Sequence, residues 1–79
     1  VKVKLFKIAK NLLSRSEARR IIFGLEKFQK IILDFQDVES VGQAFADEIF
    51  RVWQNNHQET KINYINANEN IEFMIKRAL

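Results

Sequence analysis

Apolar and polar residues alternate or cluster in three short segments, each followed by a segment with helical spacing. Over residues 1–5 apolar side chains alternate with lysines, which predicts a strand. The alternation changes phase at Phe6 and Ile8, so we expect either a β-bulge or burial of the strand's later half on both faces. Lysines along this strand suit a sheet edge, because they discourage pairing with other chains.

The second and third strands are predicted from compact apolar runs. Lys30 to Phe35 is almost continuously apolar, which is typical of a strand buried on both faces in a parallel sheet. Ile62, Tyr64 and Ile65 mark a third strand. In both strands one face is wholly apolar and the other mixed, so we expect the helices to cover mostly one side of the sheet. The other side would be partly covered, by upstream residues or by another subunit.

Three segments have helical periodicity. Ser14 with Glu17, and Ser40 with Gln43, match capping boxes at the starts of the first two helices, and the last helix begins near Asn68. The expected buried faces are Ala18, Ile21, Ile22, Leu25 and Phe28, then Val41, Phe45, Ile49, Val52 and Trp53, and finally Ile71, Met74, Ile75 and Ala78.

Two residues of the first helix stand out. Gly24 lies inside the predicted helix, where glycine costs about 1 kcal/mol relative to alanine, so we expect close packing there. Phe23 lies off the apolar stripe, and we expect it to be exposed or used in an interface.

The order strand-helix, repeated three times, predicts an α/β fold with βαβαβα order. Its sheet would have three strands or slightly more, mainly parallel and joined by right-handed crossovers. Residues 1–79 contain no linker-like segment, so we expect a single domain. The chain begins at Val1 without an initiator methionine, and we expect it to be part of a longer protein. The partly covered face leaves room for a homodimer.

The residue types present argue against an enzyme. No cysteine occurs, which excludes disulfides and thiolate chemistry, and His57 is the only imidazole. Gly24 and Gly42 are the only glycines and lie far apart, so no phosphate-binding glycine loop exists. Asp34, Asp37 and Glu39 resemble a Mg²⁺ cluster, but a polar strand end and turn explain the same residues, and we favour that interpretation. We therefore expect no catalytic residues, no metal and no cofactor.

The net charge is +3, and nine of the thirteen Lys and Arg residues precede residue 31. Arg15, Arg19 and Arg20 flank the start of the first helix and could hold a phosphate or carboxylate. They could equally pair with Glu17, Glu26 or the acids after the second strand. A small nucleic-acid-binding domain using these arginines and the first strand's lysines is the alternative function, although no aromatics interleave with them. No apolar run is long enough to cross a membrane, and we expect a cytoplasmic protein.

A resemblance to a known family covers about residues 5 to 79. The chain resembles STAS domains, the fold of sulphate-transporter tails and anti-sigma factor antagonists, and is most similar to a bacterial STAS-like family of unknown function. The matching segments are Ser14-Arg15-Ser16-Glu17-Ala18-Arg19-Arg20, Ile31-Leu33-Asp34-Phe35, Val38-Glu39-Ser40-Val41-Gly42-Gln43-Ala44-Phe45-Ala46-Asp47-Glu48-Ile49-Phe50 and Ile65-Asn66-Ala67-Asn68.

The resemblance implies a non-enzymatic regulatory module with a protein partner, a histidine-kinase-like ATPase domain in the same chain or another. In anti-sigma factor antagonists a serine before the second helix is phosphorylated. The equivalent position here is Gln43 or Ala44, neither of which can accept a phosphate. Ser40 is a separate candidate, since a phosphate at a helix start is favoured by the helix dipole.

Open α/β folds present their working surface at the carboxyl ends of the strands. We therefore expect partner docking at the loop and helix start after the second strand, through Glu39, Ser40, Gly42, Gln43 and Asp47.

Overall fold

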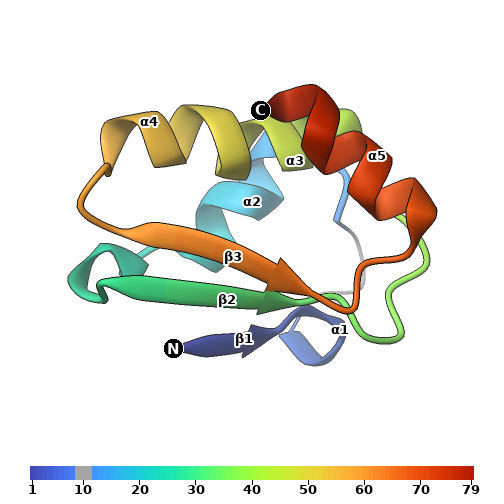
Figure 1. Ribbon diagram of the computed structural model, residues 1–79, viewed down its shortest axis with the longest axis horizontal. Helices are drawn as coiled ribbons and strands as arrows, with labels where there is room; N and C mark the ends of the chain where they lie inside the picture. Colours follow the sequence, from blue (N-terminus) through green and yellow to red (C-terminus); the bar gives the residue numbers. More distant parts are fainter. Residues whose placement is uncertain (9–11) are drawn as a thin grey trace.

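The computed structural model describes residues 1–8 and 12–79, which form a three-stranded parallel sheet with helices packed on one side (Figure 1). The strands are β1 (Lys2–Lys4), β2 (Lys30–Asp34) and β3 (Lys61–Ile65), in the spatial order β1-β2-β3. Both neighbouring pairs are parallel, as the strand-helix alternation predicts. β1 is an edge strand, in agreement with its lysines.

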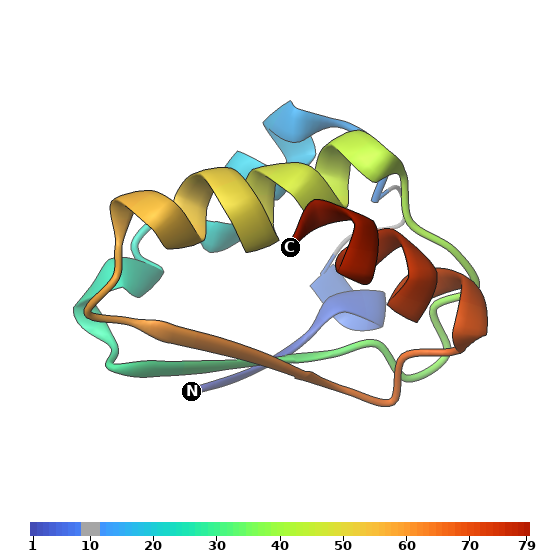
Figure 2. The same ribbon diagram turned by 45° about the horizontal axis from the view of Figure 1, so that its top comes forward.

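Helical segments connect the strands and follow the last one. They are α1 (Leu5–Ile8), α2 (Arg15–Ile22), the 3₁₀-helix η1 (Leu25–Lys27), α3 (Gln43–Asp47), the π-helix η2 (Glu48–Trp53), α4 (Gln54–Asn56) and α5 (Glu69–Ala78). α3, η2 and α4 follow one another without a break. Helix α2, this long helix and α5 all lie over the same face of the sheet (Figures 1 and 2).

The core lies between that face and the helices. Ile31, Leu33 and Phe35 point inward from β2 and its end and are at most 1% exposed. Ile32 is only half-buried, so the expectation of a strand buried on both faces is wrong: among residues 1–8 and 12–79, helices cover one face of the sheet and not the other. The remaining core residues are Leu5, Leu12, Ala18, Ile22, Val41, Phe45, Ala46, Ile49, Phe50, Trp53, Ile71, Ile75 and Ala78.

The first strand is shorter than the sequence pattern predicts. β1 ends at Lys4, and a helical turn begins at Leu5, so neither the β-bulge nor the strand half buried on both faces is present. Successive residues of a helical turn point in different directions, so Leu5 is fully buried while Phe6 and Ile8 are 58% and 52% exposed. The change of phase in the sequence therefore marks the end of the strand.

Gly24 ends helix α2 instead of lying within it. Its φ is +83°, in the left-handed region that glycine adopts without steric cost. A Cβ built at this position would have no atom within 4 Å, so the expectation of close packing is wrong. Leu25 and Phe28, predicted on the helix face, follow the helix and are half-buried. Phe23 is 85% exposed.

The long helix departs from regular α-helical spacing in its middle. Over Glu48–Trp53 its turns are π-helical, with hydrogen bonds from i to i+5 and more residues per turn. Three consecutive residues, Glu48, Ile49 and Phe50, are therefore buried, while the predicted core residue Val52 is half-buried.

Candidate functional site

The start of α3 is shaped by a close approach of two backbone segments. Its N-cap is Gly42, whose N–H donates to the Leu12 carbonyl at 2.8 Å. A Cβ at this position would lie 2.5 Å from the Leu13 carbonyl oxygen. Ser40, predicted as the N-cap, is exposed two residues earlier, so that prediction is wrong. Packing of the segment after residue 11 against Gly42 determines where the helix begins.

Gln43 does not reach back to form a capping box. Its Nε2 donates to the Met74 carbonyl of α5 at 3.1 Å, which ties the two helices together. Its Oε1 is buried and has no hydrogen-bond partner among the described residues. Gln43 and Gly42, both predicted to bind a partner, therefore make internal contacts.

Asp47 is the centre of an ion-pair cluster. Its carboxylate contacts Arg15 Nη1 of α2 at 2.8 Å, and Arg51 donates to it through Nε at 2.5 Å and Nη2 at 2.7 Å. These hydrogen bonds, first from Arg51 and then from Arg15, hold the pKa of Asp47 well below its usual range. Its side chain is 15% exposed. Asp47 thus joins α2 to the long helix, although the sequence places it on the docking surface.

The three arginines predicted to bind an anion all contact carboxylates of this chain. Arg15 and Arg19 each lie 3.5 Å from the buried Glu48. Arg20 pairs with Glu17 within α2, and Glu17's own N–H donates to Ser14 Oγ at 3.1 Å, as the first capping box predicts. All three arginines remain substantially exposed, and Arg15 and Arg19 orient α2 on the long helix.

The loop between β2 and α3, residues 35–42, keeps its polar side chains in solvent. Asp37, Glu39 and Ser40 are exposed. The backbone is nevertheless held: the Val38 N–H donates to Phe35 O at 3.0 Å, and Asn68 Nδ2 donates to the Glu39 carbonyl at 2.9 Å. Because Asn68 also caps α5 through Ile71 N–H, the loop is anchored to that helix.

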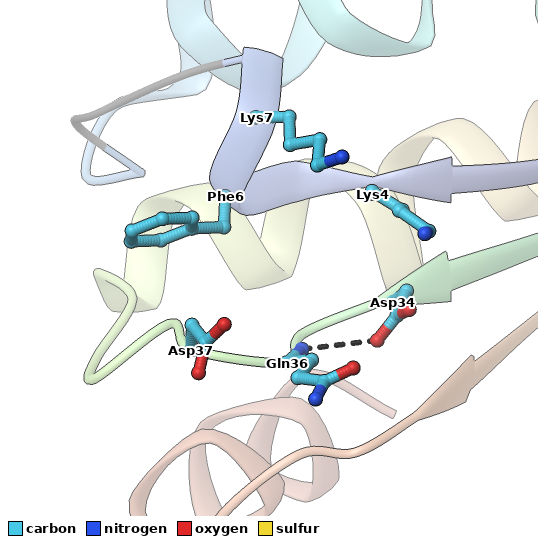
Figure 3. Close-up of a pocket in the computed structure, with 6 residues that line it drawn as sticks. All are labelled: Lys4, Phe6, Lys7, Asp34, Gln36 and Asp37. Atoms are coloured by element: carbon cyan, nitrogen blue, oxygen red, sulfur yellow. Dashed lines mark hydrogen bonds between the residues drawn. The ribbon is translucent and has the colours of Figure 1, made fainter.

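A small cavity lies beside this loop at the carboxyl ends of β1 and β2 (Figure 3). Its volume is about 150 Å³ and its lining is Lys4, Phe6, Lys7, Asp34, Gln36 and Asp37. Ligand pockets usually measure about 300–1,000 Å³, so this one has room for a few waters or a small ion.

Asp34 is the carboxylate of that cavity that is held by hydrogen bonds. It is 3% exposed, and its Oδ1 accepts hydrogen bonds from Asn66 Nδ2 at 2.9 Å and from Gln36 N at 3.0 Å. These bonds lower the pKa of Asp34. Asp34 thus links the ends of β2 and β3.

Within residues 1–8 and 12–79, no group of three or more potential metal-ligating side chains occurs.

His57 follows α4 and precedes β3. The connection between α4 and β3 lies at the opposite end of the sheet from the β2–α3 loop (Figure 1). Its ring stacks on Trp53 with centroids 4.0 Å apart, and its Nδ1 lies 2.9 Å from the Trp53 carbonyl. The histidine is half-buried, and these contacts are structural.

Two contributors to the site escaped the sequence reasoning. Arg51 fixes Asp47, and the i,i+4 spacing of an acid before a base was a usable signal. Asn68 was identified as a helix start, but its bond to the loop joins residues 29 apart in the sequence, and no local pattern reports such a contact.

Comparison with known sequences adds one finding. Residues 17–72, more than half of the chain, match the family described as "STAS-like domain of unknown function (DUF4325)". No curated protein and no solved structure matches the chain. In the described part of the chain, no helix is long and apolar enough to span a membrane.

Proposed function

Because the chain belongs to the family of STAS-like domains of unknown function, we propose that it is a non-enzymatic regulatory module that docks another protein through the β2–α3 loop. The partner we propose is a histidine-kinase-like ATPase domain, in the same polypeptide or in another. The observation that carries the proposal is a loop with a fixed backbone and solvent-facing polar side chains, at the carboxyl end of a parallel sheet.

Charge indicates the kind of surface that would meet this loop. Asp37 and Glu39 are exposed on the loop, and Glu69 is exposed at the start of the neighbouring α5. The ion pairs found among the described residues do not involve these three carboxylates. A partner with a basic patch would be steered to them.

The residues predicted for docking divide into two groups. Glu39 and Ser40 are exposed and available for contact, whereas Gly42, Gln43 and Asp47 make the internal contacts that position them. The position equivalent to the phosphorylated serine of anti-sigma factor antagonists, Gln43 or Ala44, lacks a hydroxyl. Docking at this loop would therefore depend on charge and shape, with no phosphoryl switch at that position.

A titration of the chain into a histidine-kinase-like ATPase domain, fused to it or encoded beside it, tests the proposal. Glu39→Lys should weaken binding by about tenfold or more and leave the melting temperature nearly unchanged, because the side chain is exposed. Glu59→Lys, an equal charge change in the exposed turn before β3, is the matched control and should bind like the parent chain.

Equal affinity of the Glu39→Lys variant and the parent chain would refute the docking loop. The same variant separates the alternative function: if the chain binds nucleic acid, an added lysine should strengthen binding to an oligonucleotide at low salt, which is the opposite sign.

A further inference from the structure

The sheet has one face that residues 1–8 and 12–79 leave without a helical cover. α2, the long helix and α5 lie over the other face (Figure 2). Side chains alternate along a strand, so the uncovered face, here called the lysine face, carries Lys2, Lys4, Lys30, Ile32, Asp34, Lys61, Asn63 and Ile65. Parallel sheets are usually covered on both faces, which makes this face a candidate contact surface.

The lysine face is strongly basic. It carries four lysines and one carboxylate, so its net charge is +3. The carboxylate, Asp34, is nearly buried and accepts hydrogen bonds from Asn66 and Gln36. Lys30 and Lys61 are paired directly in the register of β2 and β3, and like charges placed opposite each other are unfavourable. An acidic molecule on this face would relieve that repulsion.

Two isoleucines lie among the polar residues of this face, one on the central strand and one at the end of the edge strand β3. Ile32 of the central strand is half-buried, and Ile65 of β3 is 37% exposed. Ile32 is paired with Asn63, so Ile65 lies one strand across and two residues further along. A strand spacing of about 4.8 Å and a rise of about 3.3 Å per residue place the two isoleucines roughly 8 Å apart. Residues one to two turns apart on an α-helix have a similar axial spacing, about 6–10 Å.

We propose that the lysine face binds an acidic amphipathic helix of a partner protein, with apolar residues over Ile32 and Ile65 and carboxylates over the surrounding lysines. A second copy of this chain would bring four more lysines against the first four, so charge disfavours a dimer through this face. Nucleic acid fits less well, since the strand residues of this face include no aromatic side chain for base stacking, and the exposed Phe6 of α1 borders the face only at Lys4 and Asp34. The proposal goes beyond the docking loop and does not rest on it.

Binding of a labelled acidic peptide tests the proposal. The probe is a peptide of about 20 residues, long enough to form an isolated helix, with leucines on one face and glutamates elsewhere. A scrambled peptide of the same composition lacks the apolar stripe and should bind about tenfold more weakly by fluorescence anisotropy. Amide NMR shifts caused by the probe should concentrate at Lys2, Ile32, Asn63 and Ile65.

Charge reversal of Lys61 separates binding from folding. Lys61→Glu places a carboxylate opposite Lys30, so the melting temperature should stay the same or rise, while affinity for the probe falls about fivefold or more. Lys76→Glu, an exposed site on α5, is the matched control and should leave binding unchanged.

Three results would overturn the proposal: equal binding of the two peptides, shifts centred on the helices, or tighter binding of a DNA oligonucleotide of the same charge than of the probe. Lys61→Glu leaves Glu39 and its loop intact, so failure here is distinct from failure of the docking loop.

Discussion

The substitution Gly42→Ala should lower the free energy of unfolding by more than the addition of one methyl group suggests. Gly42 has φ −80° and ψ 154°, a conformation open to any residue, so the glycine is not required for its backbone freedom. What requires it is space. The added Cβ would lie 2.5 Å from the Leu13 carbonyl oxygen and 2.9 Å from Leu13 Cα, and both are backbone atoms that cannot rotate away.

The two backbone segments must then separate by roughly 1 Å to restore ordinary van der Waals contact. That movement strains the hydrogen bond from the Gly42 N–H to the Leu12 carbonyl. A hydrogen bond of this kind contributes about 1 kcal/mol to the free energy of unfolding. Overpacking adds about 1–3 kcal/mol, giving a total loss of about 2–4 kcal/mol. A chain of 79 residues has a free energy of unfolding of only about 4–12 kcal/mol.

Urea unfolding followed by the fluorescence of Trp53, the only tryptophan, measures this loss. The midpoint should fall while the slope m stays constant. Gly24 supplies the control, because its φ is +83° and its Cβ position is open. Asparagine tolerates left-handed backbone, so at position 24 it should be less harmful than alanine, whereas at 42 the larger residue should be worse. A loss below about 0.5 kcal/mol for Gly42→Ala would refute the close-approach argument.

The remaining predictions concern helix capping and pH. Ser14→Ala should lower the free energy of unfolding by about 1 kcal/mol, because Ser14 Oγ accepts the Glu17 N–H, while Ser40→Ala should be nearly neutral in the same urea assay; equal losses would contradict the assignment of Gly42 as the cap. Ion pairing lowers the pKa of Asp47 from 3.8, so its stabilisation is present at neutral pH and is lost as pH falls below about 4. The urea midpoint of the parent chain should therefore drop more between pH 7 and pH 3 than that of Asp47→Asn, and parallel drops would show that the pair contributes nothing.

The elements that the sequence predicted well are those whose signals are local. The third strand and the last helix match, because alternation at Ile62 and Tyr64 and the cap at Asn68 depend on neighbouring residues only. The N-cap at Ser14 matches for the same reason, although the Glu17 carboxylate, which the capping box directs back to Ser14, pairs with Arg20. The family resemblance and the parallel α/β fold are confirmed as well.

The errors arise where a distant segment decides the local structure. Serine is a favoured N-cap residue, but the helix begins after Gly42 and not after Ser40, because the backbone of Leu13 packs against Gly42. The sequence predicts Asp47 on the docking surface, whereas in the structure Arg15 of α2 packs against its carboxylate. The exposure of these residues could therefore be judged only after the helices were placed, and docking at the loop stays a prediction.

The π-helical stretch has a consequence for how a chain of this length shields its sheet. A regular helix presents a narrow apolar stripe, whereas the wider π-helical turns bury Ile49, Phe50 and Trp53 together in the core. The long helix thereby covers both the central strand and the neighbouring strand β3, as the edge-to-face contact between Phe50 and Tyr64 of β3 illustrates. A three-stranded sheet can then be covered on one face by few helices, and in the described part of the chain the opposite face stays accessible to a partner.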